Sequence, residues 1–399
     1  MSKIAIVSMH TSPLAQPGIG DGGGMNVYVR ELSASIAHLG FDCDVYTISW
    51  SKDWPEVVEV EPGLKVHNIA IEDASVFAKE HLIEVVEEFA DKVVGRLDEL
   101  PSVIHANYWL SGKVGHILKH QLEVPLVSTF HTLERMKAQS NPDLMAEVER
   151  AQAESEIMGC CDAIVASSSV EADQIVELYE VEPSRIVVVP PGVDHAFFSP
   201  GNKIQARRAL GLDEKAPITL FVGRIQPLKG THLAVEAMQD IPGLLTIVGG
   251  PSGPKGDEEL RHLHSLVGKL QLQDRVIFVD PQPHELLSTF YRAADVCVVP
   301  SRSESFGLVA LEAQSCGTPV VASAVGGLLS LVEHGITGYL VDNDNYGDYI
   351  SKVLESSELA QRLSTNSAQW SLGYTWKSSA EKLVSLFANL ATRELVECA

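Results

Sequence analysis

Short runs of apolar and β-branched residues recur along the chain, and helical patterns separate them. Runs that are apolar throughout, rather than at alternate positions, are typical of parallel strands covered on both faces. Strands that alternate with helices predict a doubly wound α/β sheet. The first set comprises KIAIVSM (3–9), DCDVYTIS (42–49), VIHAN (103–107), PLVSTFH (125–131), AIVASS (163–168) and IVVVPPGVD (186–194).

The same pattern restarts after a segment rich in proline and glycine, PPGVDHAFFSPGNK (190–203). We therefore expect two Rossmann-like doubly wound domains, residues 1–195 and 196–375, that face each other across a cleft. The last segment, 376–399, is expected to be helical and to pack back on the first domain. The second set comprises ITLFVGR (218–224), LLTIVGG (244–250), VIFVD (276–280), VCVVPS (296–301), PVVAS (319–323) and GYLVD (338–342).

Charge and cysteine content restrict the class of protein. The formal net charge of −23 argues against a protein that binds nucleic acid by neutralising phosphates, and it disfavours contact with a membrane surface. The six cysteines show no C-x-x-C pair and no Cys/His metal spacing, so we expect buried free thiols. The start of the chain does not resemble a signal peptide, and no apolar run is close to the length of a membrane-spanning helix. These features predict a cytoplasmic protein.

A glycine-rich stretch, AQPGIGDGGGMNVYVREL (15–32), contains the pattern G-x-G-x-x-G. A dinucleotide site needs its first glycine directly after the first strand and an acid at the end of the second. Here HTSPLAQP separates the first strand from the first glycine, and the second strand ends in YTISW, which contains no acid. An NAD-dependent dehydrogenase is therefore disfavoured. A flexible loop remains an alternative. Because GGGMN adjoins a helix N-terminus, a loop that binds phosphate or sugar fits better.

Two carboxylates occur in PSRSESFGLVALEAQSCGTPVVAS (300–323). Glu304 lies in a loop after a strand, and Glu312 follows eight residues later on a helix. Amides at the start of that helix favour a diphosphate. Two carboxylates beside such an anion cannot both bind phosphate, so they suit hydroxyl groups, one of a donor sugar and one of a nucleotide ribose. Two solvated acids are the alternative interpretation. The residues expected to open the helix are Ser305, Phe306, Gly307 and Leu308.

A basic pair lies at another strand end, in FVGRIQPLKG (221–230). Arg224 offers paired donors and Lys229 a compact charge, a combination suited to a departing diphosphate. Surface salt bridges are the alternative interpretation.

These motifs, with GGGMNVYVREL and PPGVD, resemble the retaining glycosyltransferases of family 4, which have the GT-B fold. Within that family, two segments resemble the bacterial glycosyltransferases of mycothiol biosynthesis: ANYWLSGKVG (106–115) and STFHTLERMK (128–137). Those enzymes transfer N-acetylglucosamine from UDP-GlcNAc to 1D-myo-inositol 3-phosphate. The alternatives are a transferase like sucrose-phosphate synthase, with UDP-glucose and another phosphorylated acceptor, and a nucleotide-sugar-binding protein without activity.

The resemblance implies a role for each matching residue. His131 would contact the donor sugar and act with Arg224, Lys229 and Glu304 in catalysis. The donor-binding residues would be Gln16, Pro17, Gly24, Arg224, Lys229, Gln282, Glu304, Ser305, Phe306, Gly307, Leu308 and Glu312. The acceptor would contact His10, Asp21, Gly22, Gly23, Gly24, Met25 and Asn26, with its phosphate held by Lys79, Tyr108, Thr132 and Arg150.

The resemblance also implies a homodimer and no cofactor for the chemistry, beyond a structural Mg²⁺ near Tyr291, Arg292, Ala294 and Thr318. Three departures leave the choice of sugar and base open. HANYW stands in place of HSHYW, so Asn107 replaces a histidine. Gln282 stands where an arginine is expected, and GGLLSLVEHG replaces GGLPVAV.

Overall fold

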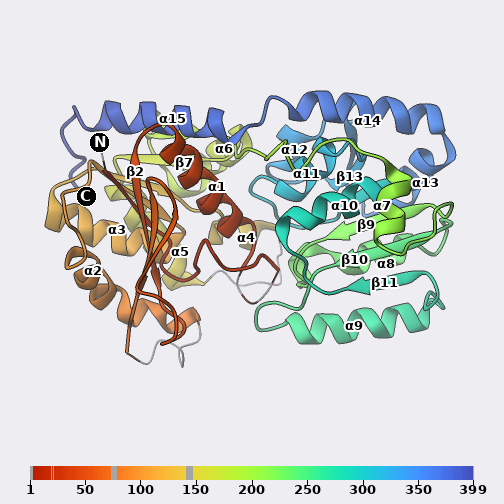
Figure 1. Cartoon of the computed structure of the whole chain (residues 1–399), viewed down its shortest axis with the longest axis horizontal. Helices are drawn as coiled ribbons and strands as arrows, with labels where there is room; N and C mark the ends of the chain where they lie inside the picture. Colours follow the sequence, from red (N-terminus) through yellow and green to blue (C-terminus); the bar gives the residue numbers. More distant parts are fainter. Residues whose placement is uncertain (1–2, 19, 21, 73–78, 141–146, 399) are drawn as a thin grey trace. The chain divides into compact units, whose positions relative to one another are not determined.

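The computed structural model describes residues 3–18, 20, 22–72, 79–140 and 147–398, without the side chains of residues 79, 80 and 140. Contacts divide the chain into two units, which Figure 1 draws with one sheet each. The first unit comprises Met1–Ala15, Met25–Pro190 and Trp376–Ala399. The second comprises Gln16–Gly24 and Pro191–Thr375, so the glycine-rich loop groups with the second unit.

The sheet of the first unit has the strand order β3-β4-β2-β1-β5-β6-β7-β8. All of its neighbours are parallel except β3 and β4, which form an antiparallel pair. The strands are β1 (Lys3–Val7), β2 (Asp42–Ile48), β3 (Val57–Glu61), β4 (Leu64–Ile69), β5 (Val103–Asn107), β6 (Leu126–Thr129), β7 (Ala163–Ala166) and β8 (Ile186–Val188). The helices are α1 (Gly24–His38), η2 (Lys79–Val85), α2 (Val86–Val94), α3 (Trp109–Leu122), α4 (Glu134–Ser140), α5 (Val148–Cys160), α6 (Ser169–Tyr179), η3 (Pro183–Arg185) and α15 (Trp376–Leu390).

The sheet of the second unit has the order β11-β10-β9-β12-β13-β14 and is parallel throughout. Its strands are β9 (Ile218–Val222), β10 (Leu244–Val248), β11 (Val276–Val279), β12 (Val296–Val299), β13 (Val320–Ser323) and β14 (Gly338–Val341). Its helices are α7 (Lys203–Ala209), η4 (Pro227–Lys229), α8 (Thr231–Ala237), α9 (Gly256–Lys269), η5 (His284–Leu286), α10 (Leu287–Ala293), α11 (Leu308–Ser315), α12 (Leu328–Leu331), α13 (Tyr346–Glu355) and α14 (Ser357–Ser371).

Both faces of the second sheet are buried, which explains its continuous apolar strands. Cys297 and Val299 of β12 belong to one apolar cluster, whereas Val296 and Val298 belong to another. Side chains alternate between the faces of a strand, so a strand covered on both faces must be apolar at every position. The predicted fold class, two parallel α/β sheets, is confirmed, and each predicted run contains a strand.

One hairpin was not predicted from the sequence, and the last helix is shorter than predicted. The hairpin consists of β3 and β4, and the pairing of β4 with β2 extends the first sheet. The final helix α15 ends at Leu390, and the described residues after it form no helix. The ring of Trp376 lies 5.8 Å from that of Tyr28, and Ser379 donates to the carbonyl of Pro190 at 2.6 Å. These contacts join α15 to the first unit.

The expectation of free thiols is wrong for two of the six cysteines. Cys160 and Cys398 form a disulfide bond, although 238 positions separate them in the sequence. The others, Cys43, Cys161, Cys297 and Cys316, are buried and free as predicted. Among the helices that the structure describes, none combines the length and the apolar character needed to cross a membrane.

Candidate active site

The second unit brings Lys229 and Glu304 together. The ammonium of Lys229, at the end of η4, lies 2.7 Å from the carboxylate Oε2 of Glu304, in the loop between β12 and α11. Their side chains are 26% and 19% exposed, so the pair is accessible to a ligand. Two strand-end loops of a parallel sheet thus place a cation and an anion at one point, as expected where such sheets bind ligands.

Close backbone packing holds these two loops in place. The Arg302 amide donates to the carbonyl of Leu228 at 2.9 Å, which joins the loop of Glu304 to that of Lys229. Gly230 and Gly326 have φ angles of 64° and 49°. A Cβ atom at Gly326 would lie 1.9 Å from the backbone carbonyl oxygen of Glu304, so only glycine fits against the backbone of this loop.

Glu312 lies on α11 and is almost completely buried. Its Oε1 lies 2.7 Å from Nε2 of His284, and its Oε2 accepts a hydrogen bond from the hydroxyl of Tyr291 at 2.8 Å. Burial and the adjacent carboxylate raise the pKa of Tyr291 well above its usual value, so that hydroxyl keeps its proton. His284 was not predicted as a site residue, because no spacing pattern in the sequence connects it with Glu312.

The helix that follows Glu304 begins later than predicted. Gly307, with a φ of 104°, is the residue before the first turn, and α11 begins at Leu308. Phe306 points into the apolar core and Ser305 precedes it in the loop. The first amides of a helix have no acceptor within the helix and face its positive end, so they suit an anionic group.

The glycine-rich loop is held within the second unit. Gln16 donates to the carbonyl of Pro281 at 3.3 Å, and Ser252 donates to the carbonyl of Gly20 at 2.6 Å. A Cβ at Gly23 would lie 3.3 Å from Nε of Arg224, so the loop runs close to this guanidinium. Pro17 and Gly22 lie in the same loop. Gly24 is the first residue of α1, and a Cβ at this position would be 3.4 Å from Leu308. Gln282 donates to the carbonyl of Asp280 at 2.9 Å, and Asp21 lies outside the described residues.

The first unit assembles most of the residues expected to bind an acceptor phosphate. The ring centroids of His10 and Tyr108 are 4.5 Å apart, and the guanidinium carbon of Arg150 lies 4.9 Å from the Tyr108 ring. Arg150 also donates to the carbonyl of Thr132 at 2.8 Å and to its hydroxyl at 3.1 Å. The side chain of Lys79 lies outside the described residues, and Met25 lies in α1.

Arg150 is more deeply engaged than the sequence suggests. Only 4% of it is exposed, and Nε lies 2.8 Å from Glu154, which is 0% exposed. A second carboxylate, that of Glu134, lies 3.3 Å from the guanidinium. Arg150 therefore neutralises buried carboxylates, whatever else it binds.

His131 follows β6 in a left-handed backbone conformation, with a φ of 62°. Its Nε2 lies 2.9 Å from Oδ1 of Asn107, so the ring donates its proton to the residue that replaces the family's histidine. Burial, and then the neighbouring His105, lower the pKa of His131 to about 3. The ring is therefore neutral at physiological pH. Asn26 is also buried and donates to Thr11 and to the carbonyl of Ser12, both at 2.6 Å.

Buried His105 and half-buried His131 should make the fold sensitive to acid. Burial lowers the pKa of His105 to about 4, against about 6.5 in an unfolded chain. Each folded-state pKa is depressed, so the unfolded chain binds more protons and stability is lost as the pH falls below about 6.5. Each histidine should reduce the unfolding free energy by up to about 1.4 kcal/mol per pH unit down to its folded pKa. Urea unfolding at several pH values gives the unfolding free energy as a function of pH. Below about pH 6.5 its slope should be shallower in His131→Gln than in the unsubstituted protein, and unchanged in the control His81→Gln.

The four residues expected near a structural Mg²⁺ have other partners. The hydroxyl of Thr318 donates to the carbonyl of Tyr291 at 2.6 Å, and the amide of Ala294 reaches the same carbonyl at 3.2 Å. Arg292 donates to the carbonyls of Ser199 and Phe197. The set contains no carboxylate, which Mg²⁺ usually requires. These residues fit the ion poorly, so a cation here remains only a prediction and no step of the chemistry depends on it.

Comparison with known proteins identifies the family of the chain. The family model for glycosyltransferase family 4 matches residues 22–197, and the model for glycosyl transferases group 1 matches residues 202–370. The D-inositol 3-phosphate glycosyltransferase of Geodermatophilus obscurus is 42% identical, over 98% of this chain and 90% of that protein. The enzyme of the same name from Mycolicibacterium smegmatis is 41% identical, over 97% of this chain and 91% of its own length.

Solved structures show the same fold. The sucrose-phosphate synthase of Thermosynechococcus elongatus superposes with a TM-score of 0.92 and 33% identity, covering 98% of this chain and 99% of that one. Anabaena HepE, solved with UDP and glucose, has a TM-score of 0.78 at 18% identity, covering 98% of this chain and 100% of that one. With about 40% identity to named glycosyltransferases over nearly its whole length, the chain belongs to glycosyltransferase family 4 and has the GT-B fold.

Proposed function

We propose that this protein transfers N-acetylglucosamine from UDP-GlcNAc to 1D-myo-inositol 3-phosphate, with retention of the anomeric configuration. The observation that carries the proposal is the Lys229–Glu304 pair. Glu304 lies eight residues before Glu312, in the loop that leads into the N-terminus of α11. A cation, a carboxylate and helix amides are the groups that a nucleoside diphosphate sugar requires. The relatives named D-inositol 3-phosphate glycosyltransferase support the choice of acceptor.

The chemistry follows from these groups. In a front-face reaction the bond between the anomeric carbon and the diphosphate oxygen breaks as the acceptor hydroxyl attacks from the same side. The acceptor proton passes to an oxygen of the departing phosphate. Arg224, Lys229 and the amides of α11 stabilise the negative charge that develops on UDP. Glu304 orients hydroxyl groups of the sugar, and Glu312 accepts from the ribose.

The acceptor requires a phosphate site, for which we propose Lys79, Tyr108, Thr132 and Arg150. His10, whose ring lies 4.5 Å from that of Tyr108, would line the acceptor beside it. A guanidinium and a hydroxyl are common phosphate ligands. Neutral His131, oriented by Asn107, would accept a hydrogen bond from a sugar hydroxyl at Nδ1 rather than transfer a proton. This role is compatible with a mechanism in which the donor phosphate takes the proton.

A second candidate is supported by the 33% identity and the TM-score of 0.92 with sucrose-phosphate synthase. An enzyme of this kind would use UDP-glucose and fructose 6-phosphate as substrates, and the residues of the donor site would keep the same roles. A protein that binds nucleotide sugars without turning them over is the third candidate.

The test is UDP release from UDP-GlcNAc and from UDP-glucose, each with and without inositol 3-phosphate and fructose 6-phosphate. Turnover only with UDP-GlcNAc and inositol 3-phosphate would support the proposal. Turnover with UDP-glucose and fructose 6-phosphate would favour the second candidate. Binding of a UDP-sugar with no release of UDP in any combination would favour the third.

A further inference from the structure

Four side chains that commonly bind metals converge in the first unit, and none of them is a predicted site residue. They are His116 and His120 on α3, Cys160 at the end of α5, and Cys398 in the segment after α15. One ligand atom from each lies within 4.8 Å of all the others. Within the part of the chain that the structure describes, no second group of three or more His, Cys, Asp or Glu side chains meets this criterion.

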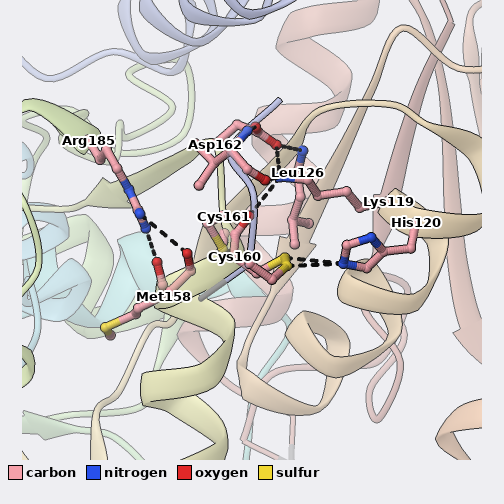
Figure 2. The surroundings of a disulfide bond; sticks show 12 residues. Lys119, His120, Leu126, Met158, Cys160, Cys161, Asp162 and Arg185 are labelled. Carbon is pink, nitrogen blue, oxygen red and sulfur yellow. Dashed lines mark hydrogen bonds and ion pairs between the residues drawn. A yellow bond between two sulfur atoms is a disulfide. The ribbon is translucent and has the colours of Figure 1, made fainter. Parts of the chain in front are cut away.

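The disulfide bond explains why the two cysteines lie together, but it does not explain why two histidines lie beside them. Nε2 of His120 lies 3.0 Å from the sulfur of Cys398 and 3.4 Å from that of Cys160, and Figure 2 shows the ring directed at both sulfurs. The ring of His116 lies one helical turn away, with its centroid 4.9 Å from that of His120. Residues four apart share one face of a helix, so α3 presents both imidazoles to the sulfurs.

The donor atoms suit one metal in particular. Zn²⁺ prefers four ligands in a tetrahedron, and two thiolates with two imidazoles form one of its common ligand sets. Bonds of about 2.3 Å to sulfur and about 2.0 Å to nitrogen place neighbouring donors roughly 3.3–3.8 Å apart. The distances from His120 to the sulfurs and the 4.8 Å limit of the group bracket this range. Once the disulfide is reduced, the sulfurs need only separate to their metal-bound spacing.

A buried ion pair holds the backbone around this cluster independently of the disulfide. The side chains of Lys119 and Asp162 are 2% and 4% exposed, and their charged groups lie 2.9 Å apart. Lys119 donates to the carbonyls of Cys160 at 2.7 Å and of Val396 at 2.9 Å. Asp162 accepts from the amide of Val396 at 2.7 Å and from that of Leu126, labelled in Figure 2, also at 2.7 Å. The segment that carries Cys398 is therefore anchored two residues before the cysteine.

We propose that the reduced pair Cys160 and Cys398, together with His116 and His120, binds one Zn²⁺ ion and ties the C-terminal segment to α3 and α5. Reduction by a dithiol breaks the S–S bond, adds two electrons and two protons, and leaves the reductant as a disulfide. Zn²⁺ then displaces both thiol protons into solution and binds the thiolates. The disulfide and the metal complex exclude each other, because both use the same sulfur atoms.

The experiment uses the full chain and Co²⁺ as a spectroscopic substitute for Zn²⁺. Reduced protein, freed of reductant, should bind one equivalent of Co²⁺ with thiolate-to-cobalt charge-transfer absorption and the visible bands of a tetrahedral site. Zn²⁺ should displace the cobalt, since it binds such ligands more tightly. Protein left oxidised should give no charge-transfer band. Absence of that band in the reduced protein would overturn the proposal.

Matched variants identify the ligands. His120→Ala and Cys398→Ser should each weaken Zn²⁺ binding at least ~10-fold in a competition with a chromophoric chelator, as expected when a direct ligand is lost. His120 is exposed, so its replacement leaves the core intact. The control His81→Ala, an exposed histidine outside the cluster, should bind Zn²⁺ as the unsubstituted protein does. Unchanged affinity in His120→Ala and Cys398→Ser, with the circular dichroism spectrum of the folded protein, would also overturn the proposal.

Discussion

Replacing Lys229 with alanine should lower kcat/KM for sugar transfer by about 100-fold or more while leaving the free energy of unfolding nearly unchanged. Removing one group that stabilises developing negative charge typically costs 10²–10³ in rate. A 100-fold loss corresponds to about 2.7 kcal/mol of transition-state stabilisation. Because Lys229 and Glu304 are both partly exposed, their ion pair contributes at most about 1 kcal/mol to stability.

Steady-state rates of UDP release would measure this loss. Arg224→Ala should act in the same direction, since the glycine-rich loop runs against its guanidinium. Lys215→Ala is a matched control, because that lysine is exposed and lies in the same unit away from the site. Near-normal turnover in Lys229→Ala would remove the lysine from the mechanism and leave its pairing with Glu304 as a surface contact.

The fold could be predicted wherever burial produced continuous apolar runs. β12 is apolar throughout because both of its faces are covered, and the sequence therefore marked it clearly. β3 is the opposite case, an edge strand whose residues are partly or fully exposed and include two glutamates. Such a strand is specified by its pairing with β4, and no local run of apolar residues reveals it.

The site was predictable as a set of residue types but not as a set of contacts. The spacing of Glu304 and Glu312 predicted an acid in a loop and an acid on a helix, and the structure places them so. The partners of Glu312, His284 and Tyr291, come from neighbouring elements that only the fold brings together. The convergence of Cys160 and Cys398 was hidden for the same reason, since it depends on where the segment after α15 runs.

Replacing Arg150 with alanine should lower the free energy of unfolding by about 3–5 kcal/mol. The guanidinium is almost fully buried and lies against the carboxylates of Glu154 and Glu134. Removing one member of a buried ion pair leaves an uncompensated charge in the interior, which is the costly case. Urea unfolding would measure the loss. The control Arg96→Ala breaks an exposed pair with Glu56 and should cost no more than about 1 kcal/mol.

The conservative variant Arg150→Lys separates this structural role from the proposed binding of the acceptor phosphate. A lysine keeps one positive charge near Glu154 but lacks the planar fork of five donors with which the guanidinium can reach a carboxylate, Thr132 and a phosphate together. If Arg150 binds the acceptor, folded Arg150→Lys should show a KM for inositol 3-phosphate at least ~10-fold higher, about 1.4 kcal/mol, with the KM for the UDP-sugar unchanged. Equal changes in both constants, or none, would make Arg150 a purely structural residue. The acceptor phosphate would then have to be held by other residues of the chain, because no neutral hydroxyl of Tyr108 or Thr132 can supply the missing charge.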